Sequence, residues 1–126
     1  MIEIKKTNEK KVFEEFGFDN DAIVMAAKDG DEIIGAGAVK IENGYAVLCD
    51  IQMKEEYKMF NMEFGIGKSL LNMLDLSGVG FVVTDMSDER LLTSLRFKKE
   101  ALEGLKTDKE YKAYLDLEGY FTTHSC

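Results

Sequence analysis

The sequence predicts a single α/β domain whose mixed sheet begins with an antiparallel meander and continues with parallel strand-helix-strand crossovers. Three observations predict this fold class. With 126 residues, of which 45% are hydrophobic, the chain is long enough for one hydrophobic core. The dipeptides Asp29-Gly30 and Asn43-Gly44 separate apolar runs, as in the tight turns of antiparallel hairpins. Amphipathic helical patterns then flank the apolar run 81–84, which is typical of a strand reached through a helical crossover.

The N-terminal part is expected to form a strand, a short helix and a three-stranded meander. Ile2 and Ile4 alternate with charged residues, which indicates a strand. Apolar residues at helical spacing then predict a helix from near Thr7 to Gly17. The strands of the meander are expected at about 22–28, 32–41 and 45–53.

The middle of the chain is expected to contain a glycine turn that opens an amphipathic helix. The polar segment 54–63 leads into Gly65-Ile66-Gly67, and apolar residues then recur at helical spacing up to Gly78. Glycine tolerates the backbone angles of a tight turn, so the helix is predicted to begin at these residues.

The C-terminal part predicts a strand, a helix and two weaker strands. The run 81–84 is apolar, and Ser87 stands where a side chain can cap a helix whose Leu91, Leu92 and Leu95 face inward. The two closing strands are expected at 98–105 and 111–117, joined around 107–109.

Charge and hydropathy exclude several classes of protein. Lys and Arg number 16 against 24 Asp and Glu, for a net charge of -8, which disfavours nucleic acid and anionic membranes as partners. No apolar run approaches the roughly 20 residues that span a bilayer, and the N-terminus lacks a signal-peptide pattern. We therefore expect a cytoplasmic protein without a membrane segment.

The cysteine and histidine content predicts no metal site. Cys49 lies in an apolar run and Cys126 is the last residue, so both are interpreted as free thiols. The single histidine, His124, lies near the same chain end and has no ligand partner at metal-binding spacing.

The glycine turn is the most informative candidate site. Backbone N–H groups at a helix N-terminus bind phosphate oxygens, and Gly65 and Gly67 lack a Cβ that would block the approach of an anion. Lys68 adds a positive charge. The alternative is that the two glycines only permit a tight connection. A nucleoside triphosphate site is disfavoured, because Met62 stands where a Walker loop has its first glycine.

The order of the elements resembles the GNAT superfamily of acyl-CoA-dependent N-acyltransferases. Three segments carry the resemblance. Asp50 to Tyr57 is similar to the end of the fourth strand of the family and its exit, and Phe64 to Leu71 is similar to its Gly-x-Gly pyrophosphate loop. Leu95-Arg96-Phe97 stands where a Leu-Gly-Phe commonly ends the later helix.

The resemblance implies that acetyl-CoA binds between two splayed strands, the one ending near Met53 and the one at 81–84. It implies that the main chain of Ile51 and Met53 contacts the thioester and pantetheine. The loop residues implied to contact the pyrophosphate are Phe64, Gly65, Ile66, Gly67 and Lys68.

The sequence also departs from the family pattern. Met62 replaces the Arg or Gln that opens the loop, Leu92 replaces the tyrosine acid, and Val47 replaces the glutamate base of some members. Asp50 and Tyr57 remain as weak catalytic candidates. Strand alternation is expected to place Cys49 on the face of Val47 and Asp50 on the opposite face.

The sequence therefore predicts an N-acetyltransferase that uses acetyl-CoA and an amine of a small molecule or protein. The alternative is a catalytically degenerate GNAT-fold module that binds acyl-CoA or a protein partner. Because only about 20 residues precede the second strand, the acceptor pocket is expected to be open or completed by a second subunit, as in a homodimer.

Overall fold

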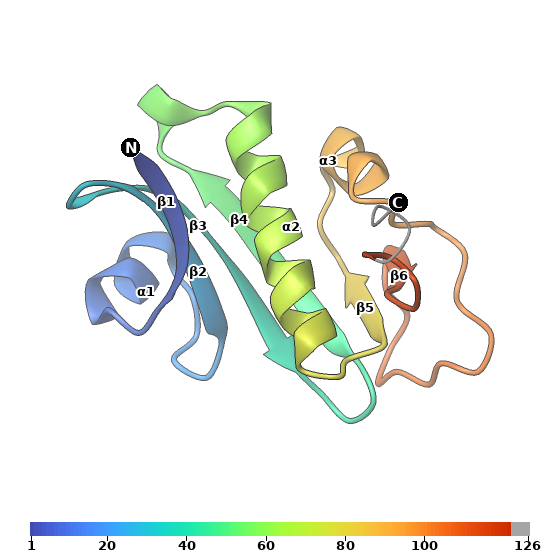
Figure 1. Cartoon of the computed structure of the whole chain (residues 1–126). Helices are drawn as coiled ribbons and strands as arrows, with labels where there is room; N and C mark the ends of the chain where they lie inside the picture. The colour runs from blue at the N-terminus through green and yellow to red at the C-terminus, as the bar shows by residue number, and fades with distance from the viewer. Residues whose placement is uncertain (122–126) are drawn as a thin grey trace.

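A computed structural model describes residues 1–121 of the chain, apart from the side chain of Phe60. One six-stranded sheet runs through the molecule, with the strands in chain order from β1 to β6 (Figure 1). The strands are β1 Ile2–Thr7, β2 Ile23–Asp29, β3 Glu32–Ile41, β4 Ala46–Met53, β5 Phe81–Thr84 and β6 Ala113–Asp116. The helices are α1 Lys10–Phe16, α2 Phe60–Leu76 and α3 Glu89–Ser94, with a short 3₁₀ turn, η1 Glu55–Tyr57.

The sheet confirms the antiparallel meander but only one of the expected parallel crossovers. β1 to β4 pair antiparallel in sequence, and the crossover through α2 makes β4 and β5 parallel. β6 then pairs antiparallel with β5, from Thr84 opposite Ala113 to Phe81 opposite Asp116. The prediction of several parallel crossovers is wrong, because the chain after α3 returns to the end of β5 before it enters the sheet.

Helices cover both faces of the sheet. α2 packs on one face, where Ile66, Leu70, Leu71 and Leu74 are fully buried against β2, β3 and β4 (Figure 1). On the other face Val12 and Phe13 of α1 bury the alternate strand residues, such as Ala36 and Ala38. Burial of about 25 cal/mol per Å² of apolar surface on both faces stabilises this arrangement.

The helix ends agree with local capping chemistry. Gly17 ends α1 in the left-handed conformation, with φ +71°, as its position after the apolar stripe indicates. α1 begins at Lys10 rather than near Thr7, whose hydroxyl accepts a hydrogen bond from Glu9 N–H. Asp88, and not the predicted Ser87, caps α3, because its carboxylate accepts from Leu91 N–H at 3.1 Å.

The predicted glycine turn is absent. α2 begins at Phe60, so Gly65 and Gly67 lie inside the helix. A Cβ on Gly67 would lie 2.8 Å from Leu95 Cδ1 and 3.3 Å from Ile51 Cδ1, and one on Gly65 would lie 3.2 Å from Ile4 Cδ1. The two glycines therefore let α2 pack closely on its neighbours and do not shape a loop.

The predicted strand 98–105 is also wrong. Within that segment only Lys98 forms a bridge, to Tyr114 of β6. The segment instead brings Leu102 and Leu105 against a small cluster formed by Tyr45, Val83 and Tyr114. This segment is therefore held to the face of the sheet by the packing of these two side chains and not by strand pairing.

Candidate functional site

β4 and β5 separate after three paired positions. The last pair is Leu48 opposite Thr84, where β5 ends, while β4 continues to Met53 alongside β3. Within residues 1–121, the stretch 49–53 thus has a strand on one side only. Such an edge presents main-chain groups that an extended ligand can pair with.

Thr84 closes the end of this opening. Its hydroxyl donates to the Leu48 carbonyl at 2.7 Å and accepts from Met86 N–H at 3.1 Å. Thr84 is fully buried. Because a buried unpaired carbonyl or N–H is costly, this hydroxyl stabilises the point where the two strands part.

A bulge in β4 changes which side chains face which side. Asp50 pairs with Ala38 and Leu48 with Val39, so Cys49 is an extra residue in β4. Leu48 and Ile51 consequently both enter the core under α2, while Cys49 and Asp50 line one pocket on the α1 face. The expectation that Cys49 and Asp50 lie on opposite faces is wrong, because it assumed unbroken alternation.

The bulge also orients a main-chain donor. Ile51 N–H donates to Oδ1 of the preceding Asp50 at 2.9 Å. This N–H therefore already binds a negatively charged oxygen, which is the kind of partner that a developing oxyanion would be. Two positions further on, the Met53 side chain lies across Gly35, where a Cβ would clash with the Met53 sulfur.

The N-terminus of α2 lies beyond the end of β4. Its first main-chain bonds run from Met62 N–H and Glu63 N–H to the Met59 carbonyl, at 3.1 and 3.2 Å. The N–H groups of Phe60 and Asn61 precede these bonds, and Met59 provides no side-chain cap. The helix end that can attract an anion is thus at residues 59–62, before the segment in which the glycine turn was predicted.

Charges around this helix end are mixed. Burial, followed by the negative charge of Asp88, raises the pKa of Glu63 above its usual value. Lys58 and Arg90 act in the opposite direction. An anion at the start of α2 would therefore be repelled by Glu63 and Asp88 and attracted by Lys58 and Arg90.

Lys68 lies deeper in α2 and is not directed at this end of the helix. Its ammonium is 4.5 Å from the ring centroid of Tyr120, 5.0 Å from Phe121 and 5.9 Å from Phe64. Burial and the nearby Arg96 lower the pKa of Lys68. The aromatic rings stabilise the ammonium by cation–π contact.

The two catalytic candidates are not brought together. Asp50 lines the pocket on the α1 face, whereas Tyr57 packs against the core under α2. A hydrogen bond with Glu32 is the main cause that raises the pKa of Tyr57, followed by burial. Tyr57 therefore belongs to a different face and a different set of partners from Asp50.

Two of the three positions that depart from the family pattern, Leu92 and Val47, are apolar and packed. Leu92 is buried and borders a pocket of about 480 Å³ with Met86 and Phe97. Val47 packs against the cluster of Tyr45, Val83 and Tyr114 on the opposite face of the sheet. Neither position offers a group that can transfer a proton.

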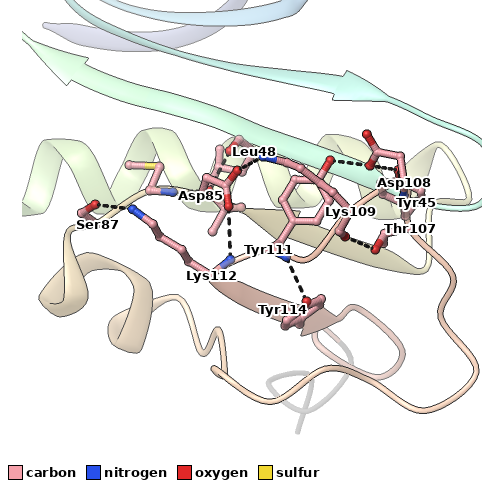
Figure 2. Close-up of polar contacts among 12 residues, drawn as sticks. Tyr45, Leu48, Asp85, Ser87, Thr107, Asp108, Lys109, Tyr111, Lys112 and Tyr114 are labelled. Atoms are coloured by element: carbon pink, nitrogen blue, oxygen red, sulfur yellow. Dashed lines mark hydrogen bonds and ion pairs between the residues drawn. The ribbon is translucent and has the colours of Figure 1, made fainter.

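A polar network that sequence spacing did not indicate holds the segment after α3 onto the sheet (Figure 2). Oδ1 of Asp108 accepts from the hydroxyls of Tyr45 and Tyr111 at 2.7 and 2.8 Å. Asp85 forms an ion pair with Lys109 and accepts from Lys112 N–H. Tyr45 and Asp85 lie far from 107–114 in the sequence, so no local spacing indicates these contacts.

Comparison with solved structures identifies the fold. A GNAT-family acetyltransferase from Elizabethkingia anophelis, crystallised with acetyl-CoA bound, superposes with a TM-score of 0.65 at 11% identity, covering 92% of this chain and 98% of that one. The chain has the GNAT fold. An N-acetyltransferase from Staphylococcus aureus gives a TM-score of 0.69 at 13% identity, covering 94% of this chain and 99% of that one. The spermidine/spermine N-acetyltransferase of Vibrio cholerae gives 0.67 at 11% identity, covering 99% of this chain and all of its own.

Comparison at the level of sequence finds no relative. No protein-family model matches the chain, and no curated protein is a significant match. The chain thus has the GNAT fold at only 10–16% sequence identity to the solved neighbours.

The described residues offer neither a metal cluster nor a membrane span. Across residues 1–121, no three His, Cys, Asp or Glu side chains come close enough together to hold a metal ion. None of the helices in that range has the length and apolar character needed to cross a bilayer. His124 and Cys126, the chain-end residues for which no metal role was expected, lie outside the described residues.

Proposed function

We propose that this protein is an N-acetyltransferase that transfers an acetyl group from acetyl-CoA to an amine. The observation that carries the proposal is the opening between β4 and β5, which leaves the bulged stretch 49–53 free on one side. Pantetheine is an extended chain with two amide groups, so it can add to such an edge through main-chain hydrogen bonds. A solved protein of this fold holds acetyl-CoA.

The proposal assigns the parts of acetyl-CoA to named main-chain groups. Ile51 and Met53 contact the thioester and pantetheine, as the resemblance implies. The pyrophosphate lies at residues 59–62, because the N–H groups of Phe60 and Asn61 precede the helical bonds of α2. Phe64 to Lys68 then only flank the pyrophosphate and do not donate to it, because their N–H groups lie in the helix interior.

The chemistry needs an acceptor nitrogen, a polarised carbonyl and a proton for the leaving thiolate. The amine lone pair attacks the thioester carbon, the C–S bond breaks, and the thiolate takes up a proton. Ile51 N–H can stabilise the developing oxyanion once the Asp50 carboxylate moves aside. Asp50 is then free to accept a proton from the attacking amine on the α1 face.

The second candidate function is a catalytically degenerate module that binds acyl-CoA or a protein partner. The observation that favours it is the apolar packing of Val47 and Leu92, where the resemblance implies a base and an acid. If the module binds acyl-CoA, acetyl-CoA binds but no amine accelerates release of CoA; if it binds only a protein partner, acetyl-CoA does not bind.

Calorimetric titration with acetyl-CoA, with acetate as the control, tests the acetyl-CoA site. Saturable heat with acetyl-CoA and none with acetate is the expected result. No binding at millimolar acetyl-CoA would refute the acetyltransferase and favour the module that binds a protein partner. CoA release over a panel of amines then separates the enzyme from the degenerate module. In that assay Tyr57→Phe is expected to lower the rate only modestly, below about 10²-fold, because Tyr57 lies on the other face from Asp50.

A further inference from the structure

The pocket on the α1 face has a volume of about 210 Å³ and adjoins the open stretch of β4. Phe16 and Phe18 from the end of α1 form one wall, and Cys49, Asp50 and Gln52 of β4 form the other. The β4 bulge is what directs both Cys49 and Asp50 into this pocket. A ligand here would thus lie across β4 from the core under α2.

The aromatic wall is held in place by contacts within the chain. The rings of Phe16 and Phe18 stack with centroids 6.0 Å apart and planes 25° from parallel. The side-chain amide of Gln52 donates to the Phe16 carbonyl at 2.8 Å, and Lys54 pairs with Glu15 at 3.3 Å. These bonds join the end of α1 to β4, so the pocket is preformed. Its ring faces suit an apolar or cationic group.

The charge of the pocket favours a single positive charge. Lys40 and Asp19 also line the pocket and form an ion pair, so these two charges compensate each other; Lys40 further pairs at 3.5 Å with Asp21, which is not among the lining residues. None of the ion pairs found in residues 1–121 involves Asp50. Its carboxylate accepts Ile51 N–H and has further lone pairs to offer. One carboxylate is therefore left for a ligand cation.

The size of the pocket limits the ligand. A volume of 210 Å³ corresponds to roughly seven water molecules at about 30 Å³ each, and is below the ~300 Å³ at which sites for drug-sized ligands begin. A long polyamine would exceed this space and would bring more charges than Asp50 can balance. A small carboxylic acid would be repelled by Asp50.

We propose that this pocket selects the acceptor of the reaction: a small primary amine with one positive charge and a short apolar or aromatic body. The inference rests on the proposed function for its role in catalysis. The binding preference itself rests on the pocket alone, and so it can be tested without acetyl-CoA.

The test is calorimetric titration of the whole protein with 2-phenylethylamine, spermidine and 3-phenylpropionate in the absence of acetyl-CoA. We expect saturable binding of 2-phenylethylamine only. Asp50→Asn should weaken it about tenfold or more, since a hydrogen bond to a charged partner is lost. Asp75→Asn removes an exposed carboxylate from α2 and should leave the binding unchanged.

A second measurement avoids substitutions in the pocket. In a Cys126→Ser background, alkylation reports on Cys49, which lines the pocket. We expect 2-phenylethylamine to slow alkylation several-fold and 3-phenylpropionate to have no effect. No protection and no saturable amine binding, or a preference for spermidine or for the acid, would overturn the inference. Amine binding without acetyl-CoA binding would instead refute only the proposed function.

Discussion

The hydroxyl of Thr84 donates to the Leu48 carbonyl at the last paired position of β4 and β5, so one side chain closes the end of the opening between the strands. The same oxygen accepts from Met86 N–H as the chain leaves β5. The separation of the two strands is therefore a hydrogen-bonded feature of the fold.

Replacing Thr84 by Val should destabilise the protein by about 1–3 kcal/mol, because the buried Leu48 carbonyl and Met86 N–H both lose their partner. Chemical denaturation measures the loss. Thr84→Ser keeps the hydroxyl and should cost clearly less. A larger loss for Thr84→Ser, which lacks the methyl group, than for Thr84→Val, which keeps one, would show that methyl packing and not the hydrogen bonds stabilises the site.

The two glycines of α2 should respond differently to alanine. At Gly65 the nearest atom is the end of Ile4, 3.2 Å from the new Cβ, and the helix gains up to about 1 kcal/mol in propensity. At Gly67 the new Cβ lies 2.8 Å from Leu95, which is fully buried, so overpacking at about 1–3 kcal/mol outweighs that gain. The midpoint temperature of thermal unfolding should be higher for Gly65→Ala than for Gly67→Ala. The reverse order would contradict this account of the helix packing.

Arg96→Gly should stabilise the protein. Arg96 has φ +71°, a conformation that costs a residue with a Cβ about 1–2 kcal/mol, and glycine's extra freedom in the unfolded chain offsets only part of that. We expect a net gain of about 0.5–1 kcal/mol by denaturation. Arg96→Ala keeps the strain and serves as the control. Both variants should raise the pKa of Lys68, which the charge of Arg96 now lowers.

Glu63→Gln should tighten acetyl-CoA binding if the pyrophosphate lies at the start of α2. The substitution removes a negative charge from that helix end. Burial and Asp88 raise the pKa of Glu63, so it takes up a proton at a higher pH than an ordinary glutamate. The wild-type affinity should therefore approach that of Glu63→Gln as the pH falls. Glu42→Gln, at the β3–β4 hairpin, is the matched control, and equal effects of both substitutions would count against this location.

Asp108→Asn should weaken the attachment of the segment after α3 mainly at neutral pH. The hydroxyls of Tyr45 and Tyr111 lower the pKa of Asp108 below its usual value (Figure 2). A carboxyl group with a depressed pKa stabilises the fold above its unfolded pKa and loses this effect as the pH falls through the folded one. Urea midpoints of wild type and Asp108→Asn should therefore converge below about pH 4. A constant difference across the range would show that the charge is not involved.

Local sequence patterns were sufficient for most of the elements. The hairpins at Asp29-Gly30 and Asn43-Gly44, and the left-handed end of α1 at Gly17, depend on backbone preferences of neighbouring residues, and the structure confirms them. The same holds for the strand at 81–84, whose apolar run is short and continuous. The order of these elements was enough to indicate the GNAT fold.

The errors arose where distant residues decide the local structure. A glycine pair is typical of a turn, so Gly65 and Gly67 predicted one. In the structure they lie inside a helix, where the close approach of Ile4 and Leu95 leaves little room for a Cβ. The face of Asp50 depended on the β4 bulge, which is defined only by pairing with Ala38 and Val39 of β3. No pattern within β4 reveals such an extra residue.

The sequence by itself determined the order of the elements and the excess of negative charge. These properties follow from residue identity and near-neighbour spacing. Only the tertiary structure decided where β4 and β5 part, which helix end is free for an anion and which side chains share the pocket with Asp50. Those features depend on strand register and side-chain packing between residues far apart in the chain, and such contacts exist only once the chain has folded.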